Sequence, residues 1–61
     1  MTVEHLIMNE EFMNKFITLA NSSFEHYGSY EDVYSMYGDE MNDDEILTLL
    51  DYCEDNDLLE Y

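Results

Sequence analysis

Apolar residues recur at helical spacing along most of the chain, and their first long run predicts a helix. Five of them share one side of a helix with about 3.6 residues per turn: Phe12, Met13, Phe16, Ile17 and Ala20. Asn9 precedes the run as a candidate N-cap, and Glu10 and Glu11 follow it, where negative charge suits the start of a helix. We expect this helix to end at residues 21–23, where Asn-Ser-Ser interrupts the apolar pattern.

A second helix is expected in the middle of the chain. Residues 29–32, Ser-Tyr-Glu-Asp, approximate a capping box with Asp in place of the usual Glu, so Gly28 and Ser29 mark the start of the element. The apolar positions of residues 33–37 continue it at helical spacing. Gly38 then supplies a C-terminal cap.

The strongest helical pattern lies near the C-terminus. Residues 42–45, Asn-Asp-Asp-Glu, form a clearer capping signature than the one before the second helix. An apolar stripe follows it and consists of Ile46, Leu47, Leu49, Leu50 and Cys53. Residues 55–57, Asp-Asn-Asp, interrupt the stripe, so residues 58–61 form either a short final turn or an extended tail.

Together these elements predict a single all-α domain over residues 1–61, built as a small bundle of three to four short helices. The apolar positions of residues 3–7 add either an earlier turn capped by Thr2 or a longer first helix. An α+β fold with a short strand pair is the alternative, because residues 16–19 or 58–61 could be extended.

Charge changes this picture more than any other property. Sixteen of the 61 residues are Asp or Glu, Lys15 is the one basic residue apart from two histidines, and the formal net charge is −15. Thirteen of the acids lie in residues 25–61, where there is no Lys or Arg. Self-repulsion opposes compaction, but nine aromatic residues supply a core. Homodimerisation would add to the stability of so small a domain.

The same imbalance excludes several classes of function. Direct binding to nucleic acid or to an anionic membrane needs basic side chains, which are nearly absent. There is no apolar run of about 18 residues and no signal-peptide pattern at the N-terminus. The single Cys53 fits a reducing compartment, so we expect a cytoplasmic protein.

Catalysis and metal binding have no recognisable pattern in this chain. His5, His26 and Cys53 are isolated and lack the paired spacing of zinc ligands. The acidic C-terminal segment lacks the EF-hand pattern and its central Gly. No Ser or Cys is spaced from a base in the sequence as a catalytic nucleophile would be. We therefore expect no enzymatic activity, no metal and no cofactor. Met36 and Met41 suggest a pliable contact surface.

The candidate functional feature is an acidic surface. Asp44, Asp51 and Asp55 fall on a narrow arc of the third predicted helix, separated along its axis by about 10 Å and then about 6 Å. These intervals are comparable to the spacing of phosphates on a nucleic-acid strand. Five more acids add charge to the predicted binding surface: Glu31, Asp32, Asp39, Glu40 and Glu54.

Tyrosines accompany these acids. Tyr27, Tyr30 and Tyr34 recur at helical spacing with Tyr37, and the stripe is either the core face of the second helix or an interface. So many phenol hydroxyls are hard to satisfy inside a small core, so some rings should lie at its rim. Tyr27, Tyr30 and Tyr34 are therefore the candidate aromatic anchors for a partner.

In composition the whole chain resembles small acidic phage proteins that imitate DNA or occupy DNA-binding sites on host enzymes, among them inhibitors of restriction enzymes, CRISPR effectors, uracil-DNA glycosylase and polymerases. The resemblance implies a non-enzymatic inhibitor that binds a basic nuclease, polymerase, repair or nucleoid protein, in the host cytoplasm if a phage encodes it. Two alternatives stay open. One is an interaction module that docks through a Tyr and apolar surface, with the acids serving solubility. The other is an acidic chaperone of basic DNA-binding proteins.

Overall fold

The computed structural model describes residues 3–60, which form four helices joined by short turns and contain no strand. The helices are α1 (Val3–Met8), α2 (Glu10–Tyr27), α3 (Glu31–Tyr37) and α4 (Asp43–Asp55). The predicted all-α bundle is confirmed. The α+β alternative is wrong for the described residues, because residues 16–19 are helical and residues 58–60 pair with no strand.

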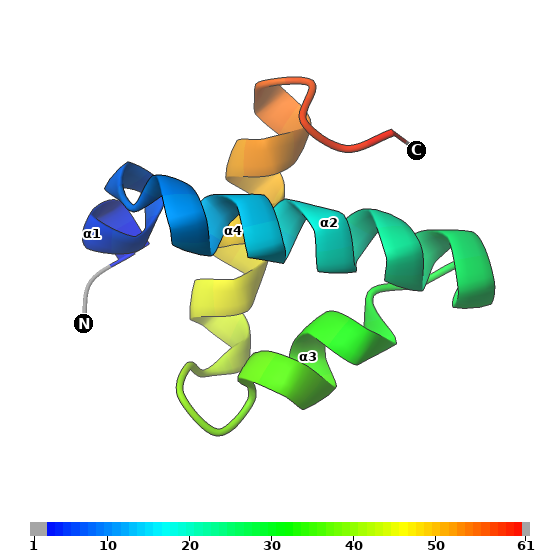
Figure 1. Ribbon diagram of the computed structural model, residues 1–61. Helices are drawn as coiled ribbons and strands as arrows, with labels where there is room; N and C mark the ends of the chain where they lie inside the picture. The colour runs from blue at the N-terminus through cyan, green and yellow to red at the C-terminus, as the bar shows by residue number, and fades with distance from the viewer. Residues whose placement is uncertain (1–2, 61) are drawn as a thin grey trace.

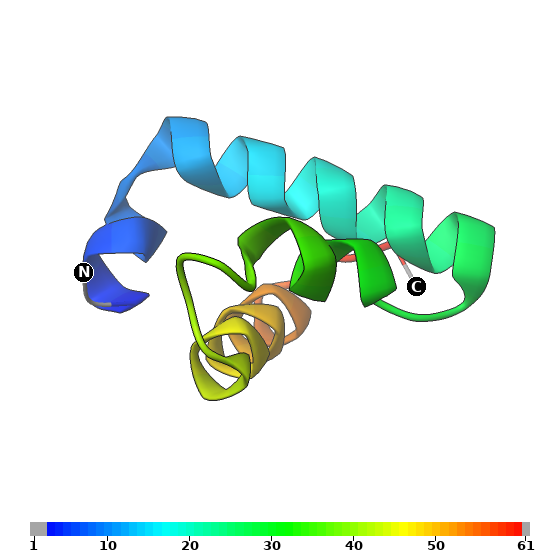
Figure 2. The same ribbon diagram turned by 90° about the horizontal axis from the view of Figure 1, so that it is seen from below.

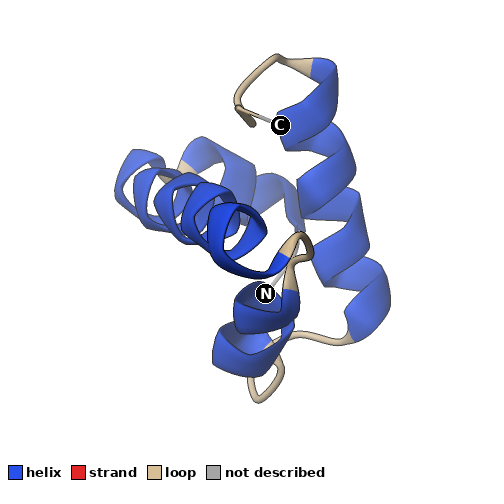
Figure 3. Ribbon diagram, turned by 90° about the vertical axis from the view of Figure 1, so that its right-hand side faces the viewer, coloured by secondary structure: helices blue, strands red, loops and turns tan. Residues whose placement is uncertain are grey.

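The two longest helices, α2 and α4, cross each other, and the two short helices, α1 and α3, pack against both of them. α2 runs across the front of the molecule with α4 behind it and α3 beneath (Figure 1). Seen from below, α2 and α4 lie on opposite sides of α3 (Figure 2). Figure 3 shows α4 lengthwise beside α2, which is viewed nearly along its axis. α1 and α3 each contact both long helices, so all four share one core.

The core lies where these helices meet. Phe16, Ile46 and Leu49 are its largest fully buried apolar side chains, and Cys53 is buried with them as predicted. Phe16 stacks on Phe12 at 5.9 Å between ring centroids, and the Tyr37 ring lies 5.4 Å from both. This aromatic group joins α3 to α2 and buries enough apolar surface to offset part of the charge repulsion.

Two of the predicted helix starts are confirmed in atomic detail. The Asn9 side chain accepts a hydrogen bond from the backbone N–H of Phe12 at 3.1 Å, which caps α2 and separates it from α1. At α4, the Asn42 side chain accepts from the Glu45 N–H at 2.9 Å, and the Glu45 carboxylate accepts from the Asn42 N–H at 3.1 Å. This is the complete capping box that the sequence predicted.

The predicted end of the first long helix is wrong. Residues 21–23 remain helical and α2 continues to Tyr27. The reason is that the Ser23 side chain faces inward and is fully buried. Its hydroxyl forms hydrogen bonds with residues 29 and 32, and so it does not interrupt the helix. Gly28 ends the helix instead, with a left-handed φ of 71° and its N–H bonded to the Phe24 carbonyl at 2.8 Å.

The predicted capping box at residues 29–32 is also wrong. α3 begins at Glu31, and its N-cap Tyr30 makes no side-chain capping bond. The Ser23 hydroxyl takes this role from α2: it accepts a hydrogen bond from the Asp32 N–H at 3.1 Å and donates one to the Ser29 carbonyl at 2.8 Å. The cap of α3 is therefore tertiary, which local sequence spacing does not reveal.

Several single-residue predictions need correction. Leu47 is not part of the buried stripe, since 48% of its surface is exposed. Met36 is exposed as expected of a contact surface, but Met41 is buried in the core and does not share that surface. Gly38 is the C-cap of α3 as predicted, but with a right-handed backbone; glycine is needed because a Cβ there would lie 2.5 Å from the Tyr34 carbonyl oxygen.

Residues 58–60 form no final helical turn, and the chain bends at Leu59. Asp57 adopts a left-handed φ of 56°, and the Leu58 N–H bonds the Cys53 carbonyl at 2.8 Å. The Asn21 amide of α2 then holds the tail: it accepts from the Glu60 N–H at 2.8 Å and donates to the Leu58 carbonyl at 3.5 Å. The suggested roles of Thr2 and Tyr61 lie outside the described residues.

Candidate functional site

The outward side of α4 carries the three aspartates singled out from the sequence. Asp44, Asp51 and Asp55 are exposed and lie on the side of the helix opposite its buried residues Ile46 and Leu49. At a rise of about 1.5 Å per residue, they run along nearly the whole length of the helix. The structure therefore presents them as a single line of carboxylates directed to solvent.

The flank of α4 that faces α3 brings acids beside the tyrosines. Burial raises the pKa of the Tyr34 phenol above its ordinary value of 10.0, and the negative charges of Asp43 and Asp51 raise it further. Burial also raises the pKa of the Tyr30 phenol, and Glu54 adds to that shift. Both shifts reflect electrostatic repulsion between the carboxylates of α4 and the ionised phenols. The two rings are half-buried, so each contributes to the core and to the surface at once.

Leu47 lies between these acids on the same flank. Successive helical residues turn by about 100°, so Leu47 falls between Asp43 and Asp51 around the α4 axis and points away from the core stripe. It is one of the larger exposed hydrophobic side chains of the described chain. We call the surface formed here the α3–α4 face; its residues are Tyr30, Tyr34, Asp43, Leu47, Asp51 and Glu54.

Sequence reasoning missed Asp43 and Leu47 as members of this face. Leu47 was assigned to the core because it adjoins Ile46 in an apolar run. A helical wheel of α4 would have separated the two, since they differ by about 100° around the axis. Asp43 was considered only as part of the cap, although its charge also reaches Tyr34.

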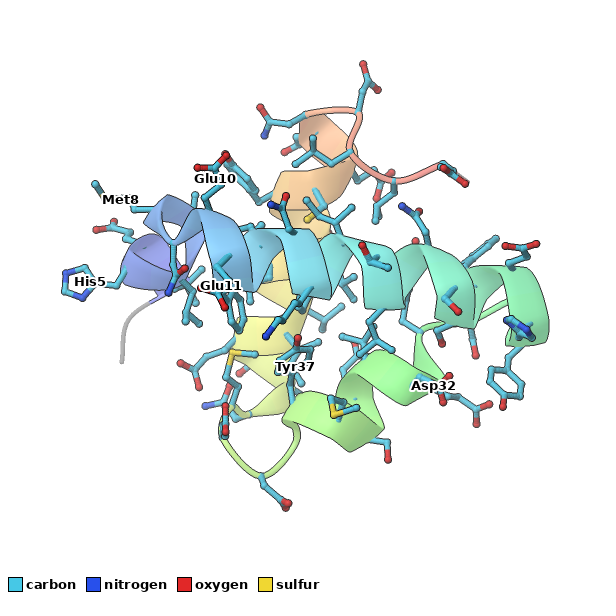
Figure 4. The ribbon with its side chains drawn as sticks, in the orientation of Figure 1. His5, Met8, Glu10, Glu11, Asp32 and Tyr37 are labelled. Atoms are coloured by element: carbon cyan, nitrogen blue, oxygen red, sulfur yellow. The ribbon has the colours of Figure 1, made fainter. Side chains whose placement is uncertain are left out.

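The remaining predicted site residues are not gathered on the α3–α4 face. Tyr27 ends α2, where it is exposed and its ring lies 6.2 Å from that of His26. Asp32 projects at the start of α3, well away from the turn that leads into α4 (Figure 4). Glu31 is exposed in the first turn of α3, and Asp39 and Glu40 lie in the turn between α3 and α4.

Charge is unevenly distributed over the molecule. The outer side of α2 carries the one lysine, Lys15, which pairs with Glu11 at 3.7 Å between exposed groups. In contrast, α3, α4 and the turn between them carry ten carboxylates, none of them buried, with no basic side chain among them. The ten are Glu31, Asp32, Asp39, Glu40, Asp43, Asp44, Glu45, Asp51, Glu54 and Asp55. Such a concentration of like charge produces a strong negative potential over this half of the molecule.

The structure was also searched for metal sites, a reactive thiol and membrane-spanning helices. Among residues 3–60, no group of three or more His, Cys, Asp or Glu side chains is arranged to hold a metal ion. Burial raises the pKa of the Cys53 thiol, which keeps it in the unreactive protonated form. No helix in the described part of the chain is both long and apolar enough to cross a bilayer.

The chain was compared with known protein families, curated proteins and solved structures. No family model, curated protein or solved structure matches the chain.

Proposed function

We propose that this chain is a non-enzymatic inhibitor that mimics the charge of DNA and occupies the basic nucleic-acid-binding groove of another protein. The observation that carries the proposal is the run of ten unburied carboxylates on α3, α4 and the turn between them, without a basic side chain among them. A net charge of magnitude about 2–8 is enough to keep a small domain soluble, and this chain carries −15.

The dimensions of the molecule suit this role. Duplex DNA carries one charge per about 1.7 Å of its axis, so fifteen charges correspond to about 25 Å of duplex. The principal extents of the protein are 29 × 24 × 18 Å. Its charge per length is therefore close to that of a short DNA segment, and its width is comparable to that of a duplex.

Recognition would combine charge with packing. Arg and Lys side chains of the partner pair with carboxylates as they do with phosphates, and Asp44, Asp51 and Asp55 offer a line of such groups. Tyr30 and Tyr34 supply half-buried rings whose orientation is already set by the core, so little entropy is lost on binding. Long-range attraction accelerates association and makes it sensitive to salt.

Affinity capture from a bacterial lysate, at low and at high salt, tests the proposal. We expect a basic DNA-processing protein to be retained at low salt and to be released by added duplex DNA. The variant D44N/D51N/D55N should lose most of the capture. E4Q/E10Q/E25Q, which removes the same charge from α1 and α2, should keep most of it. Retention that duplex DNA does not disturb would count against mimicry.

A second function is favoured by one observation, the exposure of Leu47 on the α3–α4 face. An interaction module would bind a partner protein through this apolar centre and use the acids for solubility and for rejecting wrong partners. In that case Leu47→Ala abolishes binding, whereas D44N/D51N/D55N changes mainly the association rate. An acidic chaperone of basic proteins, in contrast, would retain many unrelated basic proteins in the same capture experiment.

A further inference from the structure

A cavity of about 330 Å³ opens where α1, α2 and the turn after α3 meet. It is lined by Leu6, Phe12, Glu40 and Met41. Leu6 and Met41 are buried and Phe12 is half-buried, so three of the four lining side chains are apolar. Glu40 is exposed and supplies the one charge. The cavity shares no residue with the α3–α4 face, and Glu40 is the one lining residue that belongs to the ten carboxylates described above.

Tyr37 packs against Phe12, one of the residues that line this cavity. It reaches from α3 toward α2 (Figure 4), and its ring packs edge-on against Phe12 at 5.4 Å. Burial raises the pKa of the Tyr37 phenol, and the negative charge of Glu40 raises it further. The cavity thus combines an apolar interior with a carboxylate and an aromatic ring.

We propose that this cavity binds an arginine side chain of the basic partner. The proposal rests on the proposed function, because it takes the partner to be basic. The methylene stem of arginine packs against Leu6 and Met41. Its planar guanidinium pairs with the Glu40 carboxylate through two hydrogen bonds and lies against the Phe12 ring. A lysine ammonium has no planar pair of parallel N–H donors to match both carboxylate oxygens and no stacking surface, so arginine is the better occupant.

Charge complementarity supports this occupant over a purely apolar one. Among residues 3–60, no basic side chain lines the cavity, and the chain as a whole carries −15. Lys15 is engaged elsewhere, with its ammonium 3.7 Å from the Glu11 carboxylate. A cationic side chain entering the cavity therefore gains attraction from the whole molecule as well as from Glu40, whereas an uncharged apolar side chain gains only from the walls.

A titration of the full chain with n-butylguanidinium, followed by two-dimensional amide NMR, tests the proposal without the partner. We expect the largest shift changes at Leu6, Phe12, Glu40 and Met41. Guanidinium without the stem, n-butanol without the charge, and n-butylammonium should each cause smaller changes there at the same concentration. Equal responses to guanidinium and n-butylguanidinium, or changes that follow the acids of α4, would overturn the proposal.

Two variants of neighbouring residues give a matched control. Glu40→Gln should weaken n-butylguanidinium binding by about two- to fivefold, as expected for an exposed ion pair. Asp39→Asn removes the same charge from the same turn but lines no part of the cavity, and it should leave the affinity nearly unchanged. Equal effects of the two variants would show that only the general field attracts the probe. Because the titration uses no partner, its failure leaves the lysate capture, and hence the proposed function, to be judged separately.

Discussion

The buried hydroxyl of Ser23 in α2 accepts a hydrogen bond from the backbone N–H of Asp32 at 3.1 Å and thereby caps α3 across the fold. The same hydroxyl donates to the Ser29 carbonyl at 2.8 Å. One side chain thus provides hydrogen-bond partners for a carbonyl of the loop between the helices and for an N–H at the start of the next helix. It fixes how α3, and with it Tyr30 and Tyr34, is placed on the long helix.

Replacing Ser23 should therefore lower the free energy of unfolding by more than the small size of its side chain suggests. Ser23→Ala leaves the Asp32 N–H and the Ser29 carbonyl without their partner, which costs about 1–3 kcal/mol for a buried unsatisfied group. Ser22→Ala is the control, since Ser22 is exposed and only its backbone carbonyl is used, by the His26 ring. Urea unfolding followed by circular dichroism measures both. Equal midpoints for the two variants would contradict the role given to Ser23.

Two leucines of α4 separate core from surface. Leu49 is fully buried, and Leu49→Ala should cost about 2–5 kcal/mol, which is enough to unfold a domain of this size. Leu47→Ala should change the free energy of unfolding by less than about 0.5 kcal/mol, because Leu47 is half exposed and outside the core. Helical circular dichroism at low temperature and thermal unfolding distinguish them. A large loss of stability for Leu47→Ala would place Leu47 in the core after all.

Aspartates at the two ends of α4 should affect stability with opposite sign. Asp44 lies in the first turn, where its charge favours the helix dipole, and Asp55 is the last residue, where its charge opposes it. Asp44→Asn should destabilise and Asp55→Asn should stabilise, each by about 0.3–1 kcal/mol at low salt. Paired thermal melts at low ionic strength check this. Stabilisation by Asp55→Asn together with loss of partner binding would show that Asp55 is kept for binding at a cost in stability.

Alkaline pH should destabilise the fold. The folded state raises the pKa of the phenols of Tyr30, Tyr34 and Tyr37 above 10.0 and that of the Cys53 thiol above 9.0. Folding thus favours the neutral forms, and their contribution is intact below the ordinary pKa values. As pH rises through those values the unfolded chain loses protons first, and stability falls until the folded-state pKa values are passed.

Thermal melts at about pH 8 and about pH 11 measure this loss, and tyrosinate absorbance follows the phenols directly. Tyr34→Phe removes one of the titrating groups and should reduce the fall in melting temperature. Phenols that titrate at the same pH in the folded and the unfolded chain would contradict the burial that the structure gives them.

Local signals predicted much of this fold. Asn9 and Asn42 cap helices through bonds within three residues, so their sequence spacing was sufficient. Ser23 misled the prediction because its partners lie six and nine residues further along the chain. Leu47 misled it because an apolar neighbour in sequence need not share the same side of a helix.

The candidate surface was predictable only in part. The line of Asp44, Asp51 and Asp55 followed from helical geometry alone. The electrostatic effect of Asp43 and Asp51 on Tyr34 depends on how α3 packs against α4, which no spacing within either helix specifies. For the same reason Asp32 and Tyr27, although close in sequence to Tyr30, lie away from the α3–α4 face.

The central claim, that the acidic surface imitates DNA, is tested most directly by the salt dependence of affinity for the captured basic partner. Kd should rise steeply with NaCl concentration, with a logarithmic slope that reflects several ion pairs. D44N/D51N/D55N should weaken binding and flatten this slope, and E4Q/E10Q/E25Q should do so much less. A Kd that does not change with salt, or equal slopes for the two triple variants, would contradict the account.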